Sequence, residues 1–324
     1  MRIFLPSFFC LCFLCTQLTA QQLPLFTQYR ENYGIINPAA LSSDFHVYAY
    51  NLNVGISYRD QWTGLSGLST PKTLTARAEM IFPYSGFFGG AYVINDVAGP
   101  TSFTGAYLRG GYVLSDDIEY RGLVLGFNVG YVQHQIEITS EALEQFPGLP
   151  LGEFQSGLPD VGFGLYFYQS LGGRNSFGDF LYAGVSAPQT FGLDLTYRDL
   201  GEDFSIIRVQ HYYALLGYYY FINDDSFLEP SLWVRYVDGA PISVDLNLRF
   251  QLSKDLWIGG GYSTNENAHI DAGVLIGQNI GMDNANIKLG YGFDMLFNNL
   301  YGGRFRNSHE LNLTITLDTV GGRR

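Results

Sequence analysis

The chain has few of the features that stabilise or activate soluble exported proteins. Charged residues make up 15% of its 324 residues, against about 25% in an ordinary soluble domain. All three cysteines, Cys10, Cys12 and Cys15, lie near the start, so the rest of the chain has no thiol for a disulfide, a metal site or a nucleophile. The formal net charge is -12, which argues against nucleic acid as a partner.

No segment after the first residues has the run of about 20 apolar residues that a membrane-spanning helix needs. Residues 1–20 have the pattern of a secretory signal peptide, because Arg2 precedes the apolar stretch Ile3–Leu14 and Thr19-Ala20 supplies small residues before Gln21. The alternative is a short membrane anchor. The apolar stretch is too short for that role, so we expect cleavage near residue 20.

Aromatic residues make up 16% of the chain and glycines number 39, and many segments alternate in polarity residue by residue. In Tyr48–Arg59, one face is apolar and the other carries Asn51, Asn53, Ser57 and Arg59. Ile242–Gln251 and Glu310–Asp318 show the same period of two. Long strands with an apolar outer face and a polar inner face are typical of outer-membrane barrels.

The alternation predicts an all-β fold: a transmembrane antiparallel β-barrel of about fourteen strands over residues 46–324, placed in the outer membrane after signal-peptide cleavage. The connections agree with this count, because outer-membrane barrels have short periplasmic turns and longer outer loops. Short connections are expected at 83–86, 115–121, 223–226 and 253–255, and the longest at 136–160, 187–207 and 297–308. The strands are expected near residues 52, 76, 92, 108, 128, 165, 182, 214, 232, 246, 259, 272, 289 and 313.

Residues 21–45 suit neither a strand nor a long helix. They form either a disordered lead to the first strand or a periplasmic or plug-like segment packed into the barrel mouth. Packing is favoured because the aromatic residues would otherwise be exposed to water. The residues expected to pack are Phe26, Tyr29, Tyr33, Asn37 and Pro38.

Residues 58–75 separate the first two predicted strands and contain an Arg-Asp-Gln-Trp cluster, Gly64, Gly67 and Pro71, which together predict a loop. Trp62 is expected to pack inward or onto neighbouring loops. The polar strand faces predict a lumen whose charges form paired networks or, alternatively, a selectivity lining. These lumen-facing residues are Arg59, Arg77, Glu79, Arg235, Asp245, Arg249, Asp271, Lys288, Asp294 and Glu310.

Motifs for chemistry are scarce, so we expect no enzyme, cofactor or metal site. The five histidines have no metal-ligand spacing, and no serine lies in a Gly-x-Ser-x-Gly motif. His269 and Asp271 share a strand face and form either a base with its orienting partner or ordinary wall hydrogen bonds. Acidic residues of the outer loops either bind calcium or are simply solvated; they are Glu141, Glu144, Glu153, Asp194, Asp199, Glu202 and Asp203.

Three segments resemble the PorP/SprF family of outer-membrane proteins from Bacteroidetes, which is linked to type IX secretion and gliding motility. They are FTQYRENYGIINPAA at 26–40, YRDQWTGLSGLSTPKTLTA at 58–76, and IKLGYGFDM followed by NSHELNLTI near the C-terminus. Family members often carry Asn-Pro-Ala-Tyr-Ala-Gly-Ser where this chain has Asn37–Ser43.

The resemblance implies a non-enzymatic barrel that works with type IX secretion machinery components. Its expected partner is a large secreted, adhesin-like surface protein with a type IX C-terminal domain, which the barrel receives, exports or anchors at its outer mouth. The competing hypothesis is a diffusion porin or small-ligand transporter. The residues expected to contact the partner are Arg59, Gln61, Trp62, Phe146, Phe154, Phe191, Tyr197 and Tyr301.

Overall fold

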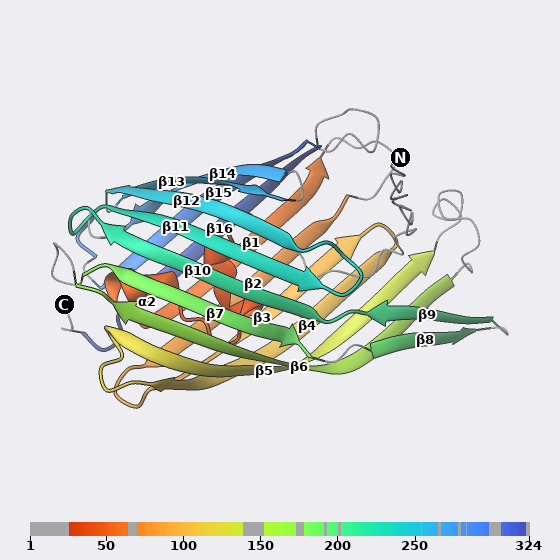
Figure 1. Ribbon diagram of the computed structural model, residues 1–324. Helices are drawn as coiled ribbons and strands as arrows, with labels where there is room; N and C mark the ends of the chain where they lie inside the picture. The colour runs from red at the N-terminus through yellow and green to blue at the C-terminus, as the bar shows by residue number, and fades with distance from the viewer. Residues whose placement is uncertain are drawn as a thin grey trace, which may run out of the picture.

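The computed structural model describes residues 26–63, 70–138, 152–172, 178–190, 193–199, 202–253, 255–264, 267–277, 280–282, 284–297 and 306–321. These residues form a closed antiparallel β-barrel around a short N-terminal segment with helical turns (Figure 1). No helix in the described ranges is both long and apolar enough to cross a bilayer. The predicted fold class is therefore confirmed.

Fourteen strands of the described chain close the barrel, and each predicted strand centre falls within one of them. The first and last strands pair from Leu52 with Leu317 to Thr63 with Asn307. The barrel strands are β1 (Leu52–Thr63), β2 (Lys72–Phe82), β3 (Phe87–Ala98), β4 (Thr101–Leu114), β5 (Arg121–Ile138), β6 (Gly152–Ser170), β7 (Phe180–Gln189), β10 (His211–Phe221), β11 (Phe227–Val237), β12 (Ser243–Ser253), β13 (Leu256–Ser263), β14 (Asn267–Ile276), β15 (Ala285–Leu296) and β16 (Arg306–Leu317).

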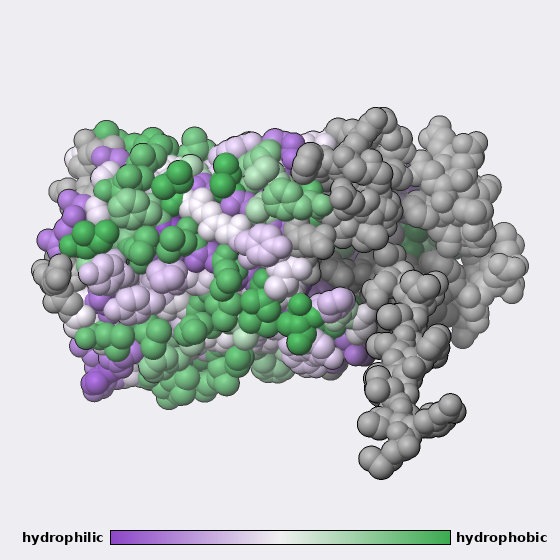
Figure 2. All heavy atoms as spheres, turned by 45° about the horizontal axis from the view of Figure 1, so that its top comes forward, coloured by the Kyte–Doolittle hydropathy of each residue, from purple (hydrophilic) through white to green (hydrophobic). Residues whose placement is uncertain are grey.

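The two faces of the wall differ in polarity as the alternation predicts. On β12, Leu246 and Leu248 are 59% and 50% exposed, whereas the alternate residues Asn247 and Arg249 are buried. Hydrophobic residues cover much of the outer wall, and hydrophilic residues gather at one end of it (Figure 2). A wall that is apolar outside and polar inside fits a bilayer around the barrel.

The two ends of the barrel differ in their connections. One end, here called the turn end, carries 83–86, 115–120, 222–226 and 254–255 between strands. The other, the loop end, carries 139–151, 190–210 and 297–305. The connections predicted to be short and those predicted to be longest therefore fall at opposite ends, although 171–179 and 277–284 at the turn end are longer than 99–100 at the loop end.

The first strand begins later and ends later than the sequence analysis predicted. Tyr48 belongs to helix α2 (Ser43–Tyr48), and Tyr50 precedes β1, because the Ser42 hydroxyl caps the helix through the Asp44 amide and Ala49 ends it with φ of 56°. At the other end, most of the predicted loop 58–75 is strand. Tyr58 pairs with Leu74, and the ladder continues to Asp60 and Lys72.

Two of the long connections also contain more strand than expected. Strands β8 (Leu193–Asp199) and β9 (Glu202–Arg208) form a separate two-stranded sheet that covers much of 187–207 and ends one residue beyond it, and β10 pairs directly with β7. This hairpin extends past the loop end (Figure 1). Within 136–160, the β5–β6 ladder continues to Ile138 and Gly152, because its residues pair without interruption. Gly64 and Gly67 of the predicted loop lie outside the described residues.

Replacing Leu246 by arginine is expected to impair barrel assembly. A positive charge within the lipid-facing band costs about 2 to 4 kcal/mol near the bilayer midplane, and Leu246 is 59% exposed on that face. Heat-modifiable migration on gels reports the folded fraction. Leu246→Ala is the control, since it removes the same side chain without adding a charge; equal folded fractions for the two variants would contradict the assignment of this face to lipid.

Candidate functional site

Residues 26–50 occupy the barrel lumen and are here called the plug. The plug contains η1 (Tyr29–Asn32), α1 (Tyr33–Ile36) and α2, and nearly all its residues are buried (Figure 1). It begins near the loop end, where Thr27 contacts Glu310, and reaches the turn end. There Asn51, the next residue after the plug, donates hydrogen bonds to Ile81 and Thr319. The N-terminal segment therefore runs through the lumen instead of covering one mouth.

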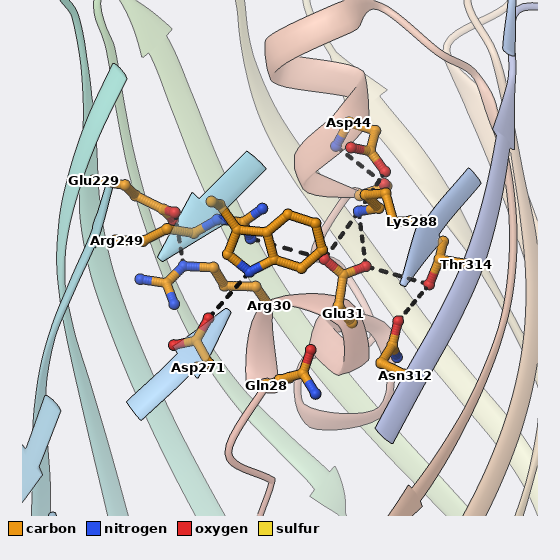
Figure 3. Close-up of polar contacts among 12 residues, drawn as sticks. Gln28, Arg30, Glu31, Asp44, Glu229, Arg249, Asp271, Lys288, Asn312 and Thr314 are labelled. Carbon is orange, nitrogen blue, oxygen red and sulfur yellow. Dashed lines mark hydrogen bonds and ion pairs between the residues drawn. The ribbon is translucent and has the colours of Figure 1, made fainter. Parts of the chain in front are cut away.

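Glu31 of the plug is the centre of the main ionic cluster (Figure 3). Lys288 of β15 donates to both carboxylate oxygens, at 2.9 and 2.8 Å. Arg77 of β2 and Arg249 of β12 lie 3.6 and 3.8 Å from the same carboxylate. One plug carboxylate thus lies within ion-pair distance of cations from three separate strands of the wall.

Asp44 of α2 lies on the other side of Lys288, with 2.7 Å between its carboxylate and the Lys288 nitrogen. Burial by itself raises the pKa of both carboxyl groups. At Glu31 the charges of Lys288, Arg77 and Arg249 outweigh burial and lower the pKa to about 2. At Asp44 burial prevails over Lys288, so its pKa is raised. Lys288 therefore lies between two carboxyl groups of the plug, whose pKa values shift in opposite directions.

A second cluster fixes the start of the plug near the loop end. Arg59 of β1 donates to Asp294 at 2.8 Å and to Glu310 at 3.2 Å. The backbone N–H groups of Thr27 and Gln28 also donate to the Glu310 carboxylate, at 2.7 and 3.2 Å. The wall carboxylate Glu310 thus satisfies both a wall cation and the plug backbone.

A third cluster joins the plug to β7 and β11. Arg30 donates to Glu229 at 2.7 Å, and the hydroxyl of Tyr182 donates to the other oxygen of that carboxylate, also at 2.7 Å. Tyr33 shares a hydrogen bond of 2.9 Å with Tyr182. Burial raises the pKa of Tyr29, beside Arg30, to about 12, against the opposing effect of Arg30. The tyrosines therefore act as neutral hydrogen-bonding groups.

The Asn37-Pro38-Ala39 turn lies directly against the wall. Asn37 donates its side-chain amide to the Leu165 carbonyl of β6 at 3.0 Å, and Ser186 of β7 donates to the Ile36 carbonyl at 2.8 Å. A Cβ at Gly164 would lie 2.0 Å from the Asn37 oxygen. Glycine at this wall position leaves the space that the turn occupies.

The structure places most of the predicted lumen residues inside the barrel. Arg59, Arg77, Arg235, Arg249, Asp271, Lys288, Asp294 and Glu310 are buried, and Glu79 and Asp245 are half-buried. The residues expected to pack in the N-terminal segment, Phe26, Tyr29, Tyr33, Asn37 and Pro38, are all buried in the plug.

The predicted partner-contact residues are placed less favourably for a surface role. Arg59, Gln61 and Phe154 are buried, and Arg59 is already engaged by the plug cluster, whereas Trp62 is half-buried at a register shift of β1 with φ of 55°. Tyr197 lies on β8. Phe146, Phe191 and Tyr301 lie outside the described residues.

The two candidate sites for chemistry have other contacts. His269 shares a hydrogen bond of 2.6 Å with Asn247, and Asp271 accepts one of 3.2 Å from the Trp257 indole, so each makes a wall contact. Among the acidic loop residues, Glu153 accepts from Gln135 and Gln155. Within the described ranges, no three acidic, histidine or cysteine residues are grouped as a metal site.

Sequence reasoning missed four charged residues of the plug clusters: Arg30, Glu31, Asp44 and Glu229. Glu229 shares a face of β11 with the predicted Arg235, so extending the period of two would have found it. Arg30 and Glu31 are adjacent charged residues in a segment rich in aromatic residues. If that segment is buried, each of them needs a partner of opposite charge, and this was the available signal. Asp44 carries no comparable signal.

Glu31→Gln is expected to destabilise the folded barrel by about 3 to 5 kcal/mol, since removing one partner of a buried ionic cluster leaves the other charges uncompensated. The measurement is guanidinium unfolding in detergent. Asp116→Asn, which breaks an ion pair with Arg121 that is exposed to solvent, is the control and should leave the midpoint unchanged. Equal midpoints for Glu31→Gln and the wild type would contradict the role of the cluster.

Gly164→Ala is expected to lower the unfolding midpoint, because the added methyl group would overlap the Asn37 side chain. Gly89→Ala on β3 is the matched control, since its Cβ would lie 3.8 Å from the nearest atom. A glycine-to-alanine change that fits its site stabilises by about 0.4 to 1 kcal/mol. If both variants unfold at the same denaturant concentration, the close contact of the plug turn is not present.

Comparisons with known proteins agree on the type of molecule. The TodX toluene transporter of Pseudomonas putida is similar at a TM-score of 0.51 and 10% identity, over 92% of this chain and 98% of TodX. The CymD monoaromatic hydrocarbon channel is similar at a TM-score of 0.54 and 8% identity, over 89% of this chain and 97% of CymD. At such identities the likeness shows the outer-membrane barrel fold alone.

No curated protein sequence matches the chain. Residues 18–315 match the family model described as type IX secretion system membrane protein PorP/SprF. Because this match spans nearly all of the chain, the protein belongs to the PorP/SprF family of type IX secretion system membrane proteins.

Proposed function

We propose that this protein is a plugged outer-membrane barrel that receives or anchors an exported surface protein at its loop end. Membership of a type IX secretion family supports the link to that machinery. The observation that carries the proposal is the plug itself, which runs through the lumen and forms hydrogen bonds or ion pairs with β1, β2, β6, β7, β11, β12, β15 and β16. A barrel closed in this way serves as a platform, and not as an open pore.

The wall-to-plug contacts oppose spontaneous opening. If the plug left the lumen, Lys288, Arg77 and Arg249 would lie together without the Glu31 carboxylate that they share. Uncompensated buried charges cost several kcal/mol each. Free diffusion of solutes through the lumen is therefore unfavourable while the plug is seated.

The loop end offers the surface on which a partner would bind. The hairpin β8–β9 and the extended β5–β6 ladder project there (Figure 1). Aromatic residues dominate the energetics of protein interfaces. We propose Trp62, Phe146, Phe191, Tyr197 and Tyr301 as partner contacts, whereas the buried Arg59, Gln61 and Phe154 support the loop end from inside.

The alternative function is a diffusion porin or small-ligand transporter. TodX and CymD, which share the fold, are named as a toluene transporter and a hydrocarbon channel. Conductance in planar bilayers separates the two functions. We expect no steady conductance from the full-length protein, whereas a porin would conduct steadily.

Deletion of the gene is expected to cause the loss of one specific large surface protein, by release to the medium or by failed export, while other outer-membrane proteins are unchanged. Surface proteomics of the deletion strain, with complementation by the intact gene as the control, measures this effect. Normal display of every type IX cargo in that strain, together with steady conductance of the intact protein, would overturn the proposal in favour of a porin.

A further inference from the structure

A groove of about 600 Å³ lies on the outside of the barrel wall, over β5, β6, β7, β10 and β11. Its volume is within the range of about 300 to 1,000 Å³ that is typical of ligand pockets. The side chains around it include Phe163, Val185, Tyr212 and Tyr236, which are exposed on the lipid-facing side. The groove is therefore a hollow in an otherwise convex apolar surface.

The groove exists because small residues interrupt a row of large ones. On the outer face of β10, Ala214 lies between Tyr212 and Leu216, and its cross-strand neighbours are Val185 and Val234. Ala187 of β7, which pairs with the exposed Phe163 of β6, is a second small residue that lines the groove. The floor is thus low, while the tyrosines and Phe163 stand around it.

The pairing of β7 with β10 is irregular beside the groove. His211 pairs with Gln189, but Tyr213 pairs with Ser186, so β7 has one extra residue between these pairs. The extra length includes Pro188, which has no backbone N–H to donate to a neighbouring strand. A bulge that contains a proline therefore interrupts the ladder between β7 and β10 beside the groove.

We propose that the groove binds an acyl chain of a bilayer lipid in the leaflet at the loop end. The occupant follows from continuity with the lipid-facing wall, because the exposed apolar residues that surround the groove already face hydrocarbon. This inference rests on the membrane location in the proposed function. It does not depend on the secretion partner.

The rim of the groove indicates how the chain is oriented. Tyr212, at the loop end of β10, donates a hydrogen bond of 2.7 Å to Gln210 and packs 6.1 Å from the Tyr236 ring. Tyrosines with an apolar body and a hydrogen-bonded hydroxyl are typical of the membrane interface. The polar head of the lipid therefore lies near Gln210, with the chain directed over Ala214 toward the turn end.

The same wall segment supports the plug from inside. A Cβ at Gly126 would lie 2.4 Å from Ala39, and Ser186 donates to the Ile36 carbonyl of the plug at 2.8 Å. Gly126, Gly164 and Ser186 also line the groove. Only the backbone of the wall separates the lipid from the plug turn, so a lipid that fills the groove stabilises the folded, plugged barrel.

The test compares the wild type with Ala214→Trp, which fills the groove from the lipid side. Ala272→Trp is the matched control, since Ala272 is an exposed alanine of β14 outside the groove, with Ile258 and Tyr291 as neighbours. Native mass spectrometry in detergent with added dimyristoyl phosphatidylethanolamine measures bound lipid. We expect the wild type and the control to retain one lipid at about tenfold lower concentration than Ala214→Trp.

A second measurement tests whether bound lipid stabilises the folded, plugged barrel. Added lipid should raise the temperature of the gel mobility shift for the wild type and the control but not for Ala214→Trp, because a ligand of the folded state stabilises it. Val234→Phe fills the same groove and replaces Ala214→Trp if the latter does not fold. Equal lipid retention by all variants would overturn the inference, and so would stoichiometric retention of a protein in place of lipid. Neither result changes the conductance or surface-display outcomes that test the proposed function.

Discussion

The mutual neutralisation of charges inside the lumen is the constraint on which the rest of the structure depends. The wall presents Arg77, Arg249 and Lys288 toward one region, and the plug supplies Glu31 to all three. Taking charges out of water costs several kcal/mol per ion unless partners and hydrogen bonds replace the solvent. The wall and the plug are therefore parts of one electrostatic unit at this cluster, because Arg77, Arg249 and Lys288 pair with a carboxylate of the plug.

Steric complementarity completes this unit where charges are absent. The Asn37-Pro38-Ala39 turn lies against wall glycines, and its amide contacts the Leu165 carbonyl. Hydrogen bonds from Ser186 and Arg109 to plug carbonyls satisfy backbone acceptors that the short helical turns leave unpaired. Irregular backbone is tolerated at membrane depth when it is buried within protein in this way.

The sequence predicted the strands of the barrel but not the ionic contacts of the plug, for physical reasons. Period-two alternation located all fourteen wall strands, because lipid on one side and a polar lumen on the other impose opposite demands on successive residues. The same alternation misassigned Tyr48 and Tyr50, which belong to the plug end, since a buried helical turn with aromatic residues resembles a strand locally. The β8–β9 hairpin was not predicted, because it lies outside the lipid-facing wall and the bilayer does not impose the alternation on its residues.

The wall residues that receive the plug depend on pairings between positions far apart in the sequence. Nothing in the local pattern connects Glu31 with Lys288 or Arg30 with Glu229, although each residue type suggests a polar setting. Strand facing was predictable for Lys288 because lipid excludes its charge from one side. Its partner was not, because the path of an irregular segment through the lumen is set by the combined shape of many side chains.

The ladder between β1 and β16 has a consequence for the order of assembly. These strands join opposite ends of the wall sequence, with Leu52 beside Leu317, and their pairing turns an open sheet into a closed ring. The plug precedes β1 directly and is held by strands from all around the wall. A segment enters or leaves a closed ring only lengthwise, through one of its mouths, so a plug that is already in place when β1 pairs with β16 is enclosed by that step.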